Sequence, residues 1–281
     1  MREIHVCDIK SAVSRLCQEA NFYLPEDVLR GLKAAKRKEQ SPWGKEIIRQ
    51  ILENAEVAAR EHIPLCQDCG ITVVYVSVGQ DVHIVGGQLY DAIEEGVAEG
   101  YITGFLRASM VDRPLSTRIN SGDNTPPIVR YDVVPGDKLR IAVMPKGEGA
   151  ENGSRVRMLD PANGRAGLVD FVVETVEVGG SSTCPPLVVG VGIGGTAGRV
   201  MWLAKRALLR PLGEPNPDPE VADLENEILE RINDLGIGPQ GLGGTVTAMA
   251  VQAEMSPCHI AALPVAVNPE CHCARHQEVV L

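Results

Sequence analysis

The sequence predicts a mixed α and β fold, an α+β arrangement that includes an α/β subdomain. Three observations support this class. Apolar residues recur at helical spacing through residues 7–60, β-branched runs such as ITVVYVSVG (71–79) follow, and helices alternate with strands after about residue 165. We therefore expect an N-terminal helical layer, an antiparallel sheet region to about residue 160, and then an α/β region with some parallel strands.

The first part is expected to hold three helices. Val6, Ile9, Val13 and Leu16 recur near helical spacing, and acidic residues follow Pro25 in the first turn of the second helix. The expected elements are a third helix from about 42 to 60, strands at 71–79 and through His83, a helix at about 88–99, and strands at 128–134 and 138–144.

Two loops stand out in this first part. Residues 107–127 are polar and interrupted by prolines, and a loop of that length in a folded domain is more often functional than filler. Residues 145–154, PKGEGAENGS, form a glycine-rich loop. Both loops are therefore candidates for a site.

The second part alternates glycine turns with regular elements. We place a boundary after residue 160, giving subdomains 1–160 and 161–281. The expected elements are a buried strand at 187–195, a helix at 198–209, a proline-rich linker at 210–219, an amphipathic helix to Leu235, a glycine-rich loop at 237–245, and strands near 246–252 and 258–267.

Composition excludes several classes of protein. The chain has 281 residues, 44% of them apolar, and a formal net charge of −10, which disfavours binding to a phosphate backbone. Aromatic residues make up 4%, too few for base-stacking platforms, so we expect no nucleic-acid partner. The N-terminus lacks a signal-peptide pattern and no apolar run spans a bilayer, so we expect a cytoplasmic protein without a membrane partner.

Eight cysteines in a reducing compartment need an explanation other than disulfides. Cys7 and Cys17 have apolar neighbours at helical spacing, and we expect both to be buried. The others are Cys66 and Cys69 in IPLCQDCG, Cys184 alone, and Cys258, Cys271 and Cys273 near the end.

The C-x-x-C segment allows three interpretations. A redox dithiol is disfavoured because a strand, rather than a helix, follows it. Half of a compact zinc site is disfavoured because the next cysteine, Cys184, is distant and alone. A metal or iron–sulfur site built from three distant loops, with soft thiolate ligands, stays open beside scattered buried cysteines.

Seven motifs, in order, resemble the iron–sulfur class I fumarases and the related tartrate dehydratases. They are PLCQDCG, RINSGDNTP (118–126), PKGEGAENGS, CPP (184–186), GIGGT (192–196), GIGPQGLGG (236–244) and HIAALPVAVNPECHCAR (259–275). The resemblance covers roughly residues 45–276. It implies mixed sheets around a cluster site.

By this resemblance, Cys66, Cys184 and Cys271 are the ligands of a [4Fe-4S] cluster whose open iron acts as a Lewis acid. The resemblance also implies Asp68 as the catalytic acid that protonates the departing hydroxide, although capping Gly70 is its alternative role. The residues expected to bind substrate are Gln67, Asp68, Arg107, Gly149 and His259.

Other residues keep two interpretations. Asn120, Asp123 and Asn124 either orient the site or form local turns. Cys69 stands where the family has Thr, and Cys273 replaces a small residue, so either could supply a fourth thiolate and close the cluster. Glu148 and Gly153 also depart from the family pattern.

The chain ends soon after Cys271, whereas single-chain members of the family continue into a second domain. It is therefore similar to the α subunit of the two-subunit enzymes, which implies a β subunit, an α2β2 assembly and a small dicarboxylate substrate. The expected reaction is the reversible hydration of fumarate to (S)-malate. Dehydration of L-tartrate is the alternative, and a non-catalytic four-thiolate cluster or zinc scaffold is a third hypothesis.

Overall fold

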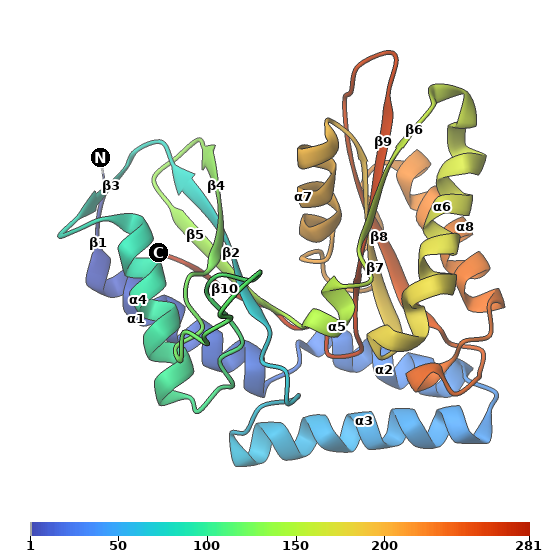
Figure 1. Cartoon of the computed structure of the whole chain (residues 1–281), viewed down its shortest axis with the longest axis horizontal. Helices are drawn as coiled ribbons and strands as arrows, with labels where there is room; N and C mark the ends of the chain where they lie inside the picture. Colours follow the sequence, from blue (N-terminus) through green and yellow to red (C-terminus); the bar gives the residue numbers. More distant parts are fainter. Residues whose placement is uncertain (1) are drawn as a thin grey trace. The chain divides into compact units, whose positions relative to one another are not determined.

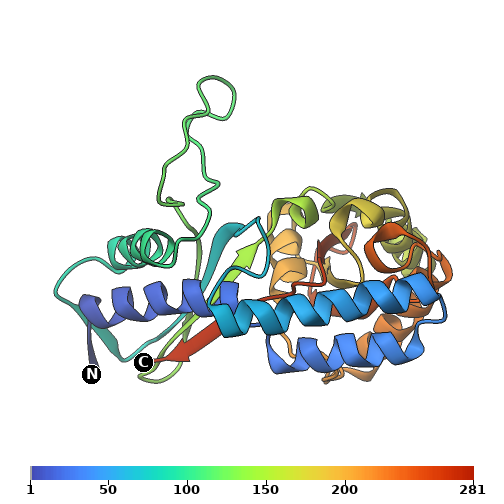
Figure 2. The ribbon, with the colours of Figure 1, turned by 90° about the horizontal axis from the view of Figure 1, so that it is seen from below.

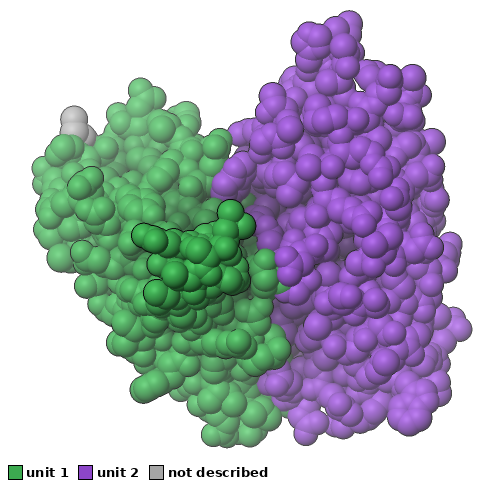
Figure 3. Space-filling view, viewed as in Figure 1, with its two compact units in different colours: residues 1–25, 55–148, 275–281 green, residues 26–54, 149–274 purple. Residues whose placement is uncertain are grey.

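Two four-stranded sheets organise the chain, and each belongs to a different unit of the fold (Figures 1 and 3). The computed structural model describes residues 2–281. Unit 1 holds the residues up to 25 with 55–148 and 275–281, and unit 2 holds residues 26–54 and 149–274. The mixed α and β class predicted from the sequence is confirmed. The division at residues 160 and 161 stays a prediction.

Unit 1 is built on a sheet with the strand order β10-β5-β2-β4. Its strands are β2 (Ile71–Gly79), β4 (Ile128–Val134), β5 (Leu139–Lys146) and β10 (Gln277–Val280). The antiparallel pairing expected here is right for β5, which runs against both β2 and β10. It is wrong for β4, which runs parallel to β2 because the long connection between them returns the chain to the same end.

Helices α1 (Val6–Phe22) and α4 (Leu89–Thr103) pack closely against each other in unit 1 (Figure 1). The approach depends on Gly96 and Gly100, because a Cβ at either would lie 2.7 Å from a backbone oxygen of α1. Cys17 is buried there as predicted, and burial raises the pKa of its thiol to about 12. The burial predicted for Cys7 is wrong, because this residue lies in the exposed first turn of α1.

The three helices predicted over residues 7–60 are confirmed, with α2 (Glu26–Lys38) and α3 (Pro42–Glu61) following α1. Ser41 caps α3, since its hydroxyl accepts the N–H of Gly44 at 3.2 Å and Pro42 occupies the first helical position. None of the helices within residues 2–281 combines the length and the apolar character needed to cross a membrane.

Unit 2 contains a sheet with the strand order β6-β9-β7-β8, in which β7 and β8 are parallel. Its strands are β6 (Arg155–Leu159), β7 (Leu187–Gly194), β8 (Ala248–Ser256) and β9 (Leu263–Glu270). One face carries α6 (Gly164–Gly179) and α8 (Pro219–Asp234), and the other carries α7 (Ala197–Ala207) (Figure 1). Gly190 and Gly192 let α7 approach, because a Cβ at either would lie 2.1 Å from a carbonyl oxygen of that helix.

Several short elements were not predicted from the sequence. They are β1 (Arg2–His5), which pairs with β3 (Val82–Val85), the strands β6 and β10, and the short helix α5 (Glu148–Glu151) inside the 145–154 loop. Strands of four or five residues are too short to show a clear alternation of apolar and polar positions. The loop over residues 107–127 is confirmed as lacking a helix or strand, apart from one isolated bridge between Val111 and Asn120.

Candidate active site

The segment that carries Cys66 connects α3 to β2 and packs closely against the end of β5. Gly70 has a φ of +76°, and a Cβ at this position would lie 2.7 Å from the backbone carbonyl of Lys146. Both observations require glycine there. This glycine therefore lets the C-x-x-C segment turn sharply into the sheet of unit 1.

Asp68 is held by two backbone donors. One carboxylate oxygen accepts the N–H of Gly70 at 2.9 Å, and the other accepts the N–H of Glu148 at 2.8 Å. The predicted alternative, that Asp68 caps Gly70, is thus found in the structure. The second bond fixes the carboxylate between this turn and the loop after β5, so its orientation is set by backbone on both sides.

Cys66 and Gln67 flank this aspartate. The Cys66 sulfur accepts the N–H of Asp68 at 3.4 Å, and its thiol donates to the side-chain oxygen of Gln67 at 3.3 Å. Cys66 is partly buried and Gln67 is exposed. A thiol, an amide and a carboxylate are therefore presented on three consecutive residues of one turn.

Cys69 points the other way, into unit 1. It is buried, its sulfur accepts the backbone N–H of Arg107 at 3.2 Å, and its carbonyl accepts the hydroxyl of Tyr101 at 2.7 Å. Burial is the main reason why the pKa of the Cys69 thiol is raised. These contacts anchor the backbone of Arg107 beside the turn and leave its side chain exposed.

Arg275 belongs to this group and was missed from the sequence. Its guanidinium is 4% exposed and donates to the backbone carbonyls of Asp68 and Pro145. An arginine at the end of the CHCAR motif was the only available signal. Sequence alone could not show that it lies on the inner side of the Asp68 turn.

The three polar residues of the long loop have different roles. Asn124 is buried, and its amide nitrogen donates to the Gly70 carbonyl at 3.1 Å while its oxygen accepts the N–H of Ser109 at 2.8 Å. Asn120 and Asp123 instead accept N–H groups two residues ahead, as in Asx turns. Burial raises the pKa of Asp123, but hydrogen bonds from Thr125 outweigh it and hold the pKa below its usual range.

In unit 2, two of the predicted ligands lie on adjoining turns. The carbonyl of Cys184 accepts the backbone N–H of His272 at 3.2 Å and lies 3.0 Å from the Nδ1 atom of that ring. Cys184 is exposed, with a left-handed φ of 54°, and Cys271 directly precedes His272. The turn before Pro185 and the turn after β9 are therefore joined through Cys184 and His272, the residue next to Cys271.

Gln240, also missed from the sequence, joins this group. Its side-chain nitrogen lies 3.0 Å from His272 Nδ1, and its backbone N–H donates to the Pro185 carbonyl at 2.9 Å.

A hydrogen bond with the buried Cys273, together with burial, raises the pKa of the Cys271 thiol well above its usual value. Cys273 is thus close to a predicted ligand.

Gly149 and His259 lie in different parts of unit 2. A Cβ at Gly149 would be 3.6 Å from the Ser182 carbonyl, which places this glycine near the turn that leads to Cys184. His259 lies in the exposed turn between β8 and β9, where its Nδ1 accepts the N–H of Ala261. The eight residues of β9 separate it from Cys271 by about 26 Å at the usual rise per residue. The substrate contact predicted for His259 stays a prediction.

The predicted ligands are divided between the units, with Cys66 in unit 1 and Cys184 and Cys271 in unit 2. Within either unit of the described chain, no three His, Cys, Asp or Glu side chains gather as a metal site. None of the eight cysteines forms a disulfide. Three thiols outside any disulfide, two of them exposed or partly buried on joined turns, suit a soft, thiolate-bound group.

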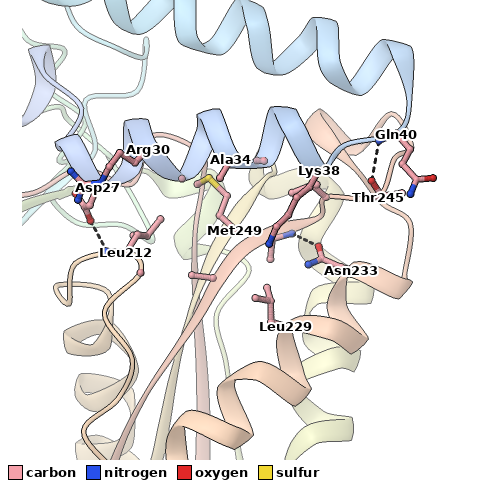
Figure 4. Close-up of a pocket in the computed structure, with 16 residues that line it drawn as sticks. Asp27, Arg30, Ala34, Lys38, Gln40, Leu212, Leu229, Asn233, Thr245 and Met249 are labelled. Atoms are coloured by element: carbon pink, nitrogen blue, oxygen red, sulfur yellow. Dashed lines mark hydrogen bonds between the residues drawn. The ribbon is translucent and has the colours of Figure 1, made fainter.

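A separate cavity of about 440 Å³ lies in unit 2, between α2 and the edge strand β8 (Figure 4). Asp27 accepts the Leu212 N–H at its rim, and the Asn233 side chain accepts N–H groups of Thr247 and Ala248. None of the predicted site residues lines it.

Comparison with known proteins places the chain in a family. The family model of fumarate hydratase (Fumerase) matches residues 10–280. The chain therefore belongs to this family of hydro-lyases, and the resemblance stated from its motifs is confirmed.

Two similar relatives extend this result. The chain is 42% identical over 268 residues to a protein of Methanocaldococcus jannaschii named "Putative L(+)-tartrate dehydratase subunit alpha", and the match covers 94% of each chain. It is 36% identical to the L(+)-tartrate dehydratase subunit alpha of Escherichia coli O157:H7, over 93% of this chain and 89% of that one.

Proposed function

We propose that the chain is the cluster-bearing α subunit of an iron–sulfur hydro-lyase that reversibly hydrates fumarate to (S)-malate in the cytoplasm. The observation that carries the proposal is the joining of Cys184 to His272, because it puts two thiols, far apart in sequence, on adjoining turns. L(+)-tartrate is the second candidate substrate, favoured by the names of the relatives.

Cys66, Cys184 and Cys271 would hold a [4Fe-4S] cluster. The absence of disulfides at these cysteines and the N–H donated to the Cys66 sulfur suit thiolate ligands, because an N–H···S hydrogen bond stabilises the negative sulfur. When bound, the cluster supplies a Lewis-acidic iron that polarises a substrate hydroxyl and carboxylate. Cys69 is excluded from the ligand set in this proposal because its sulfur faces the Arg107 backbone.

The remaining groups bind substrate and move protons. Arg107 offers an exposed guanidinium, which can hold a carboxylate through two parallel hydrogen bonds. Gln67 donates its amide N–H to a substrate oxygen, and Gly149 allows close approach of backbone. These contacts fix a four-carbon dicarboxylate relative to Asp68.

In the dehydration direction, the C2–O bond of malate breaks and its electron pair leaves with the hydroxyl. A protonated Asp68 gives its proton to that hydroxyl, so water departs. The proton on C3 goes to a base of the β subunit, and its C–H electron pair forms the double bond. The β subunit, in an α2β2 assembly, thus completes the site.

The test is anaerobic reconstitution of the chain with the β subunit from the same organism, followed by assays of fumarate hydration and L-tartrate dehydration. Cys184→Ala should lose bound iron, sulfide and both activities, whereas the matched variant Cys69→Ala should keep them. The relative rates would rank the two substrates. No turnover of either substrate, with an air-stable cluster that is lost in Cys69→Ala, would instead indicate a closed four-thiolate scaffold.

A further inference from the structure

Residues 108–123, which we name the arm, project from unit 1 between α4 and β4 (Figure 2). The two sides of the arm pair at one isolated bridge between Val111 and Asn120. All residues from Asp112 to Gly122 are exposed. The arm therefore contributes almost nothing to the core of unit 1, although the chain invests sixteen residues in it.

The arm is nevertheless held in one shape by its own hydrogen bonds. The carboxylate of Asp112 accepts the N–H of Ile119 at 2.9 Å, and the backbone N–H of Asp112 donates to the Ile119 carbonyl at 2.9 Å. Further bonds are Arg118 to the Pro114 carbonyl, Asn120 to the Ala108 carbonyl, and Ser121 N–H to the Met110 carbonyl. A preformed element loses less conformational entropy when it binds a partner.

Large apolar side chains cover this exposed element and its base. Leu115 at the tip is fully exposed, Ile119 is 63% exposed, and Phe105 just before the arm is 91% exposed. A single exposed apolar residue needs no explanation, but two on this projecting element and a third at its base indicate an interaction surface. Arg113 and Arg118 lie among them. The Asp112 carboxylate bonds within the arm, and one guanidinium nitrogen of Arg118 does so too.

The base of the arm is part of the unit 1 site. Arg107, which enters the arm, donates its N–H to the Cys69 sulfur, and Asn124, which leaves it, bonds to the Gly70 carbonyl. Asn124 also joins the two sides through Ser109. A partner chain that binds the arm is therefore adjacent to the turn that carries Asp68.

From these observations we infer that the arm is the docking element for the β subunit. This inference rests on the proposed function, in which a second chain must reach Arg107 and Asp68 to complete the site. A chain that contacts Arg107 lies beside the arm, because the arm directly follows Arg107 in the sequence. The complementary surface on the β subunit is an apolar recess for Leu115 and Ile119, with carboxylates at its rim for Arg113 and Arg118.

The test measures binding, separately from turnover. Leu115→Ser and Ile119→Ser, singly and together, are titrated with the purified β subunit under anaerobic conditions and compared with wild type by calorimetry. Val178→Ser is the matched control, because Val178 is an apolar residue on α6 that is about as exposed as Ile119. We expect the double variant to raise the dissociation constant for the β subunit about tenfold or more, and the control variant to leave it unchanged.

Two outcomes would overturn the inference. Unchanged affinity of the double variant for the β subunit would show that the arm is not the docking element. Loss of self-association in sedimentation, with normal affinity for the β subunit, would show that a second copy of this chain is the occupant. A wild-type complex that forms but turns over neither substrate would refute the proposed function alone, since the binding comparison would still be measured.

Discussion

The side chain of the buried Arg275 donates a hydrogen bond to the backbone carbonyl of Asp68, and so links the segment before the last strand, β10, to the turn after α3. The same side chain reaches the carbonyl of Pro145, which precedes the loop whose Glu148 N–H binds the Asp68 carboxylate. Three segments that are distant in sequence thus meet at one aspartate. The position of Asp68 therefore depends on residues that have no proposed part in the reaction itself.

Replacement of Arg275 by leucine should destabilise the protein. The buried carbonyl of Pro145 and the partly buried carbonyl of Asp68 would lose their donor, and each unsatisfied buried polar group costs about 1–3 kcal/mol. Arg275→Lys should cost less, because it keeps the charge and one donor. Urea unfolding of both variants checks this, with Arg140→Leu as control, since Arg140 makes an exposed ion pair worth at most about 1 kcal/mol. Equal effects of the Arg275 and Arg140 variants would contradict the structural role.

Asp68→Asn should lower kcat about 10²- to 10⁴-fold, the usual contribution of a positioned acid or base, with little change in KM. An amide keeps the size of the side chain and can still accept one of its two N–H donors, so the fold should survive. Steady-state kinetics of the reconstituted complex, beside circular dichroism and iron content, measure this. A loss of activity that merely follows a loss of bound iron would argue for a structural role.

How much of this could be read from the sequence depends on the range of the interaction. The helices of residues 7–60 could be predicted because the spacing of apolar residues along a helix is a local pattern. The C-Q-D-C-G motif could be recognised because its residues are consecutive in the sequence. Arg275 and Gln240 were missed because their partners lie more than thirty residues away in the sequence. His259 was expected in a strand, but it lies in a turn, since β9 begins only at Leu263.

Gly70→Ala should destabilise the protein more than Gly122→Ala. Both glycines have positive φ, at +76° and +84°, so alanine is strained by about 1–2 kcal/mol at either. A Cβ at Gly70 also meets the Lys146 backbone at 2.7 Å, whereas nothing lies within 4 Å of one at Gly122. Thermal unfolding of the two variants compares the effects. Similar losses would mean that β5 yields easily to the extra atom.

Glu39 supports a prediction about pH. Its carboxylate is 1% exposed and accepts the backbone N–H groups of Thr245 and Val246 at 3.0 and 2.9 Å, so it joins the end of α2 to the glycine-rich loop of unit 2. Burial raises the pKa of Glu39, but these bonds and one from Ser41 outweigh it and hold the pKa below its usual value. The ionised form is therefore favoured in the folded protein.

Glu39→Gln should accordingly destabilise the protein at neutral pH, because an amide nitrogen would face N–H groups that now bind a carboxylate oxygen. Since the folded pKa lies below the unfolded value of about 4.3, the carboxylate's contribution is fully present above that value and is lost as the pH falls through the folded pKa. The difference in urea midpoint between wild type and variant should thus be constant from pH 7 to about 5 and shrink below about 4. Glu56→Gln, on the exposed face of α3, should show no such difference. A gap between wild type and Glu39→Gln that widens on acidification would mean that the carboxylate is held against its ionisation rather than for it.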